Sequence, residues 1–172
     1  MVSKNINLKD DLVFKRDLRG HNFIFHSTFG LFSPKDIDEG TELLINNINI
    51  KPNDISLDLG CGYGPIGLAV AKLSPFGVVH MVDKDFVAID YTRKNAEVNG
   101  IKNCEIYLSN GFSNISDNIK FNNIMCNVPA KVGKELYWIL LNDAKQHLKE
   151  GGKLYFVSIR GLKDFFKRYF KE

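Results

Sequence analysis

The segment that decides the fold is Ser56-Leu57-Asp58-Leu59-Gly60-Cys61-Gly62-Tyr63-Gly64-Pro65-Ile66-Gly67. Leucines alternate with polar residues first, glycines then alternate with other residues, and a proline opens an apolar run. This order predicts a strand, a tight turn and a helix. Glycine is needed where the backbone takes a positive φ or lies close to a ligand, and the free N–H groups that begin a helix attract anionic groups. We therefore expect Gly60, Gly62 and Gly64 to lie against a small molecule.

Two kinds of cofactor suit this turn. The spacing Gly62-x-Gly64-x-x-Gly67, with Asp83 about 20 residues further on, matches the dinucleotide fingerprint. Asp58 weighs against a dinucleotide, because a carboxylate two residues before the first glycine repels a pyrophosphate. The same carboxylate suits a ligand that carries an ammonium group, such as S-adenosylmethionine. A tight turn without a ligand is the remaining interpretation.

The composition indicates one soluble globular domain. The chain has 172 residues, of which 44% are hydrophobic and 25% are charged, which is enough for a core. No apolar run approaches the roughly 20 residues that span a bilayer, and the first residues lack the apolar core of a signal peptide. We expect a cytoplasmic protein with no membrane partner, in which residues 1–50 form an N-terminal hairpin and helix and residues 51–172 form the cofactor-binding core.

Neither a metal site nor a disulfide framework is predicted. The 3 cysteines are an odd number without short paired spacing, and the 4 histidines show no ligand spacing. The net charge of +3 is too small to establish a nucleic-acid partner. Basic residues gather near both ends of the chain, and they would form a phosphate-contacting surface if the two ends meet.

Apolar runs alternate with amphipathic segments from residue 55 onward. We expect strands at residues 55–59, 78–82, 104–108, 121–126 and 153–159, and helices at residues 65–73, 86–98, 134–148 and 162–170. A hairpin at residues 14–19 and 22–26, a loop at 29–33 and a helix at 36–47 are expected before them. Such alternation predicts a parallel sheet with right-handed crossovers. The predicted fold class is α/β, with a Rossmann-like, doubly wound, mostly parallel sheet.

Polar residues follow the predicted strands at the sheet edge where ligands of such folds bind. Asp83 is expected to accept both ribose hydroxyls, with a capping role for the next helix as the alternative. Asn110-Gly111 is expected to bind the adenine amino edge, with a simple Asn-Gly turn as the alternative. Lys84 and Phe86 are expected to flank the adenine.

A second chemical signature lies at Asn127-Val128-Pro129-Ala130. Proline fixes its own φ and restricts the residue before it, so this corner is rigid. The Asn127 side-chain oxygen and the Val128 carbonyl are two acceptors that suit an NH₂ group. Fixed acceptors turn the amine lone pair toward an electrophile, such as a sulfonium methyl group. Asn127, Val128 and Pro129 are therefore the predicted catalytic residues, and a strand-ending turn without chemistry is the alternative.

The segment from Asp58 to Gly64 resembles the first motif of class I S-adenosylmethionine-dependent methyltransferases. Phe29-Gly30-Leu31-Phe32-Ser33 and Asp38-Glu39-Gly40-Thr41-Glu42-Leu43-Leu44 resemble the segment that precedes this motif in the small-domain methyltransferases. That group includes ribosomal RNA guanine-N2 methyltransferases and archaeal single-domain relatives. The resemblance runs from about Phe29 to the C-terminus.

The resemblance implies S-adenosylmethionine as the cofactor and a site for each of its parts. Asp58 would help to hold the amino end, Asp83 the ribose and Asn110 the adenine. The methionine part would be lined by Gly60, Cys61, Gly62 and Gly64. The segment from Asn127 to Ala130 falls where the family has Asn-Pro-Pro and an aromatic residue, the motif that holds the target amine. The implied activity is N-methylation of an exocyclic base amine in an RNA partner, ribosomal or transfer RNA.

The chain departs from the family pattern in two places. Val128 replaces the first proline, and Ala130 replaces the aromatic residue that would stack on a planar target. Stacking contributes roughly 1–3 kcal/mol per base, so we expect Phe29 or Phe32 to take over if the target is a base. The two C-terminal hairpin strands of the fold are absent from the sequence, which would leave the fifth strand as an edge. A monomer or a weak homodimer is expected.

Other functions stay open at this point. A protein glutamine N-methyltransferase would use the same two acceptors for its target amide, and a small-molecule N-methyltransferase is a third possibility. The altered corner at Asn127 also suits a cofactor-binding partner subunit without catalysis. An NAD-dependent oxidoreductase is the alternative that the spacing of the glycines leaves open.

Overall fold

The computed structural model describes residues 11–128, 133–158 and 160–169. Its centre is a five-stranded sheet in which neighbouring strands follow the order β5-β4-β3-β6-β7, and every pair is parallel. The strands are β3 (Ile55–Leu59), β4 (Val78–Asp83), β5 (Cys104–Leu108), β6 (Phe121–Asn127) and β7 (Leu148–Val157). The order reverses beside β3, and ligands of such sheets bind at that point. The predicted α/β class is confirmed.

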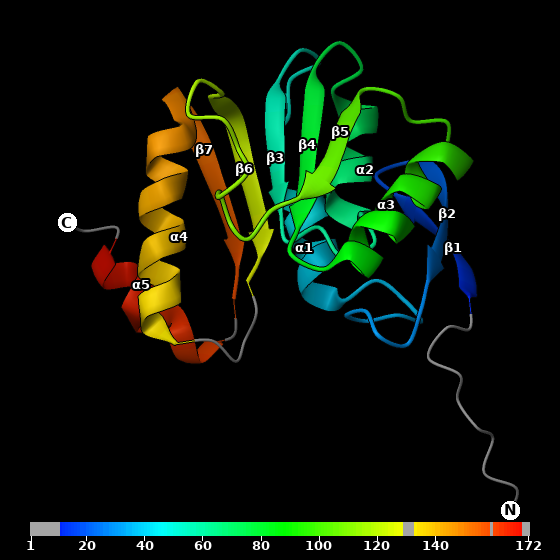
Figure 1. The fold of residues 1–172 in the computed structure, drawn as a ribbon, viewed down its shortest axis with the longest axis horizontal. Helices are drawn as coiled ribbons and strands as arrows, with labels where there is room; N and C mark the ends of the chain where they lie inside the picture. The colour runs from blue at the N-terminus through cyan, green and yellow to red at the C-terminus, as the bar shows by residue number, and fades with distance from the viewer. Residues whose placement is uncertain (1–10, 129–132, 159, 170–172) are drawn as a thin grey trace, which may run out of the picture.

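Helices cover both faces of the sheet (Figure 1). On one face lie α1 (Glu39–Asn47), α2 (Pro65–Leu73) and α3 (Phe86–Val98), and on the other lie α4 (Lys134–His147) and α5 (Lys163–Tyr169) after a 3₁₀ turn at Arg160–Leu162. Two buried clusters follow, because strand side chains alternate between faces. Met81 and Met125 belong to the first cluster, and Val82 and Ile124 belong to the second.

Local sequence sets the start of α2 and its packing on the sheet. Gly64 takes φ 95° and Pro65 occupies the start of the helix, where proline costs no hydrogen bond. Gly67 allows α2 to pack closely on the sheet, since a Cβ there would lie 2.4 Å from Met81 Sδ. The strand, turn and helix predicted at residues 55–73 are therefore confirmed.

The N-terminal hairpin forms its own two-stranded antiparallel sheet, β1 (Leu12–Leu18) and β2 (His21–Ser27). The free edge of β2 is paired by two asparagine side chains of α3. Asn95 Oδ1 accepts from His26 N at 2.7 Å and Asn95 Nδ2 donates to His26 O at 2.8 Å. Asn99 makes the same two bonds with Ile24, at 2.9 and 2.7 Å. Two side-chain amides thus replace a neighbouring strand.

Several boundaries differ from the sequence expectation. Helix α1 begins at Glu39 rather than residue 36, because Asp38 caps it. Strand β7 begins at Leu148 rather than residue 153, and residues 150–152 lie at an irregularity within that strand, where the register to β6 shifts. The last helix begins at Lys163 rather than residue 162, because the turn before it, Arg160–Leu162, is 3₁₀.

The described basic residues of the two ends do not meet. The hairpin with Lys15 and Arg16 packs beside α3, whereas α5 with Lys163 and Lys167 lies beyond α4 at the opposite flank (Figure 1). The phosphate-contacting surface that depended on their meeting is therefore absent from the described part of the chain. As expected, the fifth strand of the parallel sheet, β7, lies at its edge. Among the described helices, none combines the length and hydropathy that a membrane span requires.

Candidate functional site

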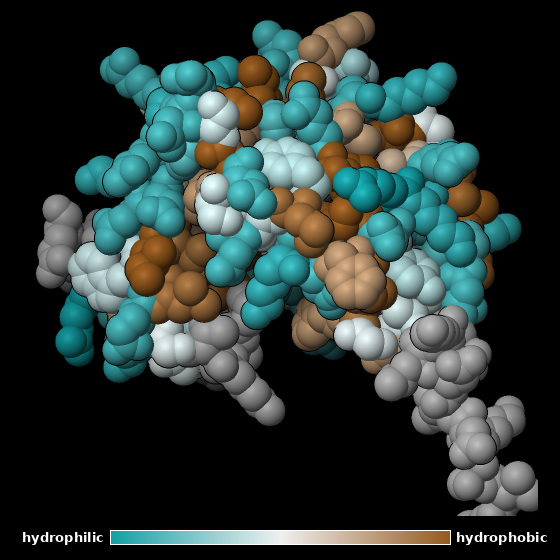
Figure 2. Space-filling view, in the orientation of Figure 1, coloured by the Kyte–Doolittle hydropathy of each residue, from teal (hydrophilic) through white to brown (hydrophobic). Residues whose placement is uncertain are grey.

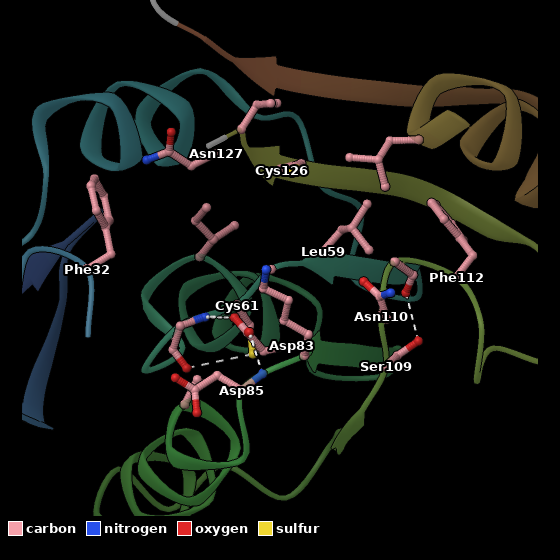
Figure 3. A pocket seen from close by; sticks show the side chains of 18 of the residues that line it. Phe32, Leu59, Cys61, Asp83, Asp85, Ser109, Asn110, Phe112, Cys126 and Asn127 are labelled. Carbon is pink, nitrogen blue, oxygen red and sulfur yellow. Dashed lines mark hydrogen bonds between the residues drawn. The ribbon is translucent and has the colours of Figure 1, made fainter. Parts of the chain in front are cut away.

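A cavity of about 1510 Å³ opens at the carboxyl ends of the strands. Nine of the twelve residues predicted for the site line it, namely Gly60, Cys61, Gly62, Asp83, Lys84, Asn110, Gly111, Asn127 and Val128. Asp58 and Gly64 do not line the cavity, and Pro129 lies outside the described residues, as does Ala130. Figure 3 shows the two ends of this space, with Asn110 and Phe112 at one and Asn127 and Phe32 at the other.

The glycine turn leaves open space above its backbone. Gly60 and Gly62 take φ values of 76° and 59°, and a Cβ on either residue would meet no atom within 4 Å. The N–H groups of Gly60 and Cys61 both donate to Val82 O at 2.9 Å, which ties the turn to β4. Gly64 serves another purpose than expected, since a Cβ there would lie 3.1 Å from Thr92 Cγ2. It allows the turn to pack against α3.

Cys61 lies in this turn with 4% of its surface exposed. Its Sγ is 3.6 Å from Thr92 Oγ1. Burial raises the pKa of the Cys61 thiol well above its usual range, and the Asp58 carboxylate adds to this effect. A thiol of this kind stays protonated and is a poor nucleophile.

Asp58 is a fully buried carboxyl group with an unused acceptor. Its Oδ2 accepts from Gly67 N at 2.7 Å, in the first turn of α2. Its Oδ1 has no hydrogen-bond partner among the described residues. The pKa of Asp58 is raised to about 7, above all by burial; the Gly67 N–H opposes this rise and the nearby Asp83 carboxylate adds to it. A cationic group near the turn would favour the ionised form, so this carboxyl fits a ligand with an ammonium group.

The sequence leaves two roles open for Asp83, a contact with the ribose and a cap for the next helix. In the structure the cap is Asp85, and Asp83 remains available to a ligand. Asp83 Oδ2 accepts from Gly62 N and Asp83 Oδ1 accepts from Asp85 N, both at 3.0 Å. Each carboxylate oxygen keeps acceptor capacity for a ligand. The cap of α3 is Asp85, whose Oδ1 accepts from Val87 N at 2.9 Å. The alternative that Asp83 caps this helix is wrong.

The Asn110 end of the cavity is formed by the turn at Asn110-Gly111 and by the ring of Phe112. Gly111 takes φ 60°, and Ser113 N donates to Asn110 O at 3.3 Å, so the Asn-Gly turn exists while the exposed Asn110 also lines the cavity. Phe112 lies against His147 with ring centroids 5.1 Å apart. Phe86, expected beside the adenine, is 65% exposed and does not line the cavity.

At the other end, the Asn127 amide is oriented by its neighbours. Asn127 Nδ2 donates to Asp38 Oδ2 and to Thr41 Oγ1, each at 2.9 Å. Both amide hydrogens are therefore engaged, and the oxygen Oδ1 is the group left to accept. Val128 N donates to Val157 O at 2.9 Å, which fixes the end of β6 against β7.

The cavity lining is acidic. Six carboxylates and one lysine lie among its described lining residues, a formal charge of −6 + 1 = −5 with histidine neutral, from Asp38, Glu39, Asp83, Asp85, Asp117, Asp143 and Lys84. A dinucleotide would bring its pyrophosphate into this field, whereas a ligand with sulfonium and ammonium groups is attracted by it. The electrostatics disfavour the NAD alternative.

Several lining residues were not assigned a role from the sequence. Asp85 and Phe112 stand close to residues that were singled out, and a search for a helix cap after Asp83 would have found Asp85. Asp38 and Thr41 lie in a quoted segment, but their contact with Asn127 crosses 89 and 86 residues of chain. No short-range signal announces that contact.

The relatives found by comparison with known proteins include methyltransferases. A model of the methyltransferase small domain family matches residues 22–171. The protein YbxB of Bacillus subtilis is 39% identical over 141 residues, which cover 81% of this chain and 70% of YbxB. Ribosomal RNA small subunit methyltransferase C of Haemophilus influenzae is 34% identical over 157 residues, covering 88% of this chain and 47% of that protein. The chain thus spans about half the length of this curated methyltransferase.

A solved structure shares both fold and sequence. The 16S rRNA methyltransferase of T. thermophilus, in complex with AdoMet and guanosine, superposes with a TM-score of 0.80 and 25% sequence identity. The match covers 87% of this chain and 42% of the T. thermophilus chain.

Proposed function

Since the chain belongs to the methyltransferase small domain family, we propose that it is an S-adenosylmethionine-dependent methyltransferase and that it methylates an exocyclic base amine in RNA. The observation that carries this proposal is the Asn127 amide, whose two hydrogens are engaged so that its oxygen remains to accept from a substrate NH₂ group. The relative from H. influenzae is named as a ribosomal RNA methyltransferase. The T. thermophilus relative was solved with guanosine, a nucleoside with an exocyclic amine.

We assign the cofactor to the half of the cavity around the glycine turn. The open space over Gly60 and Gly62 admits the methionine part, and Asp58, which is buried and does not line the cavity, acts on its ammonium group through its charge alone. Asp83 retains acceptor capacity for the ribose hydroxyls. Asn110 and Lys84 line the part of the cavity that would receive the adenine.

The chain's own contribution to chemistry is orientation of the amine. S-adenosylmethionine, when bound, supplies a methyl group on a positively charged sulfur, which leaves as a neutral thioether. Asn127 Oδ1 and the Val128 carbonyl accept the two hydrogens of the target NH₂ group and direct its lone pair toward that methyl group. They also stabilise the positive charge that develops on the nitrogen. The extra proton then passes to water, because an N-alkylated aromatic amine in its protonated form is strongly acidic.

The size of the cavity and an exposed aromatic ring in its lining support a planar target. The cavity of about 1510 Å³ exceeds the roughly 300–1,000 Å³ typical of a single small-molecule site. Phe32 lines it, is 68% exposed, and lies beside Asn127 in Figure 3. We assign to Phe32 the stacking role that Ala130 cannot perform.

The acidic lining adds a condition on how RNA binds. Phosphate groups are repelled by a formal charge of −5, so only the base enters the cavity and the backbone stays at its rim. A base in a helix must leave its stack to do this. Single-stranded loops and bulges of RNA are accordingly the expected targets.

The same lining favours one alternative, a protein glutamine side chain. A carboxamide presents an NH₂ group to the same two acceptors and carries no phosphate. The two substrates differ in what surrounds the amine, because stacking on Phe32 strengthens the binding of a flat base and adds little to an amide on a flexible chain.

Methyl transfer from labelled S-adenosylmethionine separates these possibilities. We expect the label to enter ribosomal RNA and to be released by nuclease but not by protease; the opposite pattern would replace the RNA proposal by the glutamine alternative.

Replacing Asn127 by Ala should abolish turnover and leave cofactor affinity nearly unchanged. Asn47, whose exposed amide donates to Leu43 O at the far end of α1, provides the matched control, and Asn47→Ala should keep full turnover. Equal turnover in the Asn127 and Asn47 variants would refute the mechanism.

A further inference from the structure

We propose that Asp38 and Thr41 are positioning residues that hold the Asn127 amide with its oxygen toward the target amine. The proposal rests on the proposed function, since it explains how one asparagine side chain is fixed as an acceptor. Nothing in the sequence motif at Asn127 supplies this control, because an asparagine amide can rotate by half a turn and exchange its donor and acceptor ends.

The hydrogen bonds decide between the two orientations. Asn127 Nδ2 lies 2.9 Å from Asp38 Oδ2 and 2.9 Å from Thr41 Oγ1. The carboxylate of Asp38 accepts hydrogen bonds and donates none. A flipped amide would place Asn127 Oδ1 against that carboxylate, and two acceptors at hydrogen-bond distance repel. The arrangement therefore admits one orientation only.

Asp38 is itself fixed, because it also caps α1. Its Oδ2 accepts from Gly40 N at 3.0 Å and from Thr41 N at 3.2 Å. The partial positive charge of a helix N-terminus stabilises a carboxylate in this place. One oxygen thus receives donors from the helix and from Asn127, so the start of α1 and the end of β6 form a single unit.

Gly40 makes this unit possible by close approach. A Cβ on Gly40 would lie 2.8 Å from Val157 Cγ1 and 2.9 Å from Asp38 Oδ2. Any side chain at this position would push α1 away from β7 or displace the carboxylate that holds Asn127. The start of α1 therefore packs against Asn127 and Val157, in addition to covering the sheet.

The same segment is tied to the glycine turn. The hydroxyl of Tyr63, which is 4% exposed, lies 3.2 Å from Ser33 O and 3.2 Å from Asp36 O. Residues 33–41 consequently connect the turn that we assign to the cofactor with the amide that we assign to the target. This connection sets where the amine acceptor lies relative to the methyl donor, and it requires the substrate to present a hydrogen-bond donor to Asn127.

The test uses variants that change one acceptor at a time. Thr41 is 6% exposed, and Thr41→Val removes its hydroxyl while it keeps the shape. We expect kcat to fall about tenfold, as the loss of one hydrogen bond implies, with the dissociation constant for S-adenosylmethionine unchanged within about twofold. Thr41→Ser restores the hydroxyl and should recover most of the lost kcat. A Thr41→Val enzyme with wild-type kcat, or a Thr41→Ser enzyme as impaired as Thr41→Val, would overturn the proposal.

Asp38 gives a second, independent pair. Glycine and asparagine both serve as helix caps, so Asp38→Gly and Asp38→Asn should both fold. Only asparagine keeps an oxygen for Asn127. We expect Asp38→Gly to lose roughly 10- to 100-fold in kcat, because hydrogen bonds to charged groups are the stronger ones, and Asp38→Asn to recover most of it. Equal kcat in these two variants would contradict the positioning role.

A measurement without substrate distinguishes this proposal from the proposed function. Solvent exchange of the Asn127 side-chain amide hydrogens, followed by NMR on labelled protein, should be at least about tenfold faster in Thr41→Val than in wild type. Unchanged exchange would overturn the positioning of Asn127 whatever the substrate is. Faster exchange in a protein whose wild type methylates no RNA would support the positioning and overturn the RNA proposal.

Discussion

Replacing Asp58 by Asn should make the ligand-free protein more stable at pH 8 and should weaken cofactor binding. Asp58 is fully buried, and its pKa is raised from 3.8 to about 7, first of all by burial. The folded state therefore holds a proton between about pH 4 and pH 7 that the unfolded state has released. Stability falls as pH rises through this window and levels off above pH 7, because a buried carboxylate without a cation is costly.

The size of the effect follows from the pKa difference. Three units at about 1.4 kcal/mol each give roughly 4 kcal/mol as the cost of ionising Asp58 in the folded state at pH 8. Between pH 5 and pH 8 the wild type should lose about 3 kcal/mol from this group. The amide introduced by Asp58→Asn does not titrate, so that part of the pH dependence should disappear. The low pKa of His80, which burial causes, affects both proteins equally and cancels in the comparison.

Urea unfolding of the two proteins at pH 5, 6, 7 and 8 measures this difference directly. An exposed carboxylate, Asp90 of α3, supplies the control Asp90→Asn, which retains Asp58 and should therefore keep the loss of stability between pH 5 and pH 8. Titration with S-adenosylmethionine should show that wild-type affinity rises with pH up to about 7 and that Asp58→Asn binds more weakly without this rise. A stability difference between Asp58→Asn and wild type that stays constant from pH 5 to pH 8 would refute the reasoning.

Two further predictions concern packing. Gly67→Ala should lower the free energy of unfolding by about 1–3 kcal/mol in spite of the better helix propensity of alanine, since its Cβ would lie 2.4 Å from Met81 Sδ; thermal unfolding measures this, and a stabilised variant would contradict the close approach. Asn95→Ala should cost about 2–4 kcal/mol, because Asn95 makes three hydrogen bonds, two with His26 and one from Nδ2 to Tyr63 O at 2.9 Å. Hydrogen exchange should then quicken in β2 and in the glycine turn, and unchanged protection of β2 would show that the asparagine pairing contributes little.

Local signals in the sequence were sufficient for the elements around the glycine turn. Pro65 and Ser74-Pro75 mark the ends of α2, and Asn99-Gly100 marks the end of α3, so these bounds agree with the structure. The start of β7 could not be predicted in this way. Its first residues pair with Phe121 through a register shift that depends on the neighbouring strand, and the glycines at 151 and 152 look like a turn when read alone.

In the candidate site too, local motifs could be predicted from the sequence, whereas contacts between residues far apart in the chain could not. The glycine turn and Asp83 are contiguous motifs or lie at strand ends, and the sequence places them at one edge of the sheet. The orientation of Asn127 depends on Asp38, 89 residues earlier in the chain, and the docking of β2 depends on Asn95, 69 residues later than His26. The position of Gly64 in the motif predicts a contact with the ligand. In the structure, the need for a glycine at this position comes from its packing against Thr92.

The atom that receives the methyl group tests the central claim most directly. In the mechanism that we propose, two acceptors at Asn127 and Val128 select an NH₂ group, so ribosomal RNA treated with this protein and S-adenosylmethionine should yield a nucleoside methylated on its exocyclic nitrogen. Digestion to nucleosides and mass spectrometry against synthetic standards identify that atom. A methyl group found instead on a ribose oxygen or a ring carbon would contradict the account.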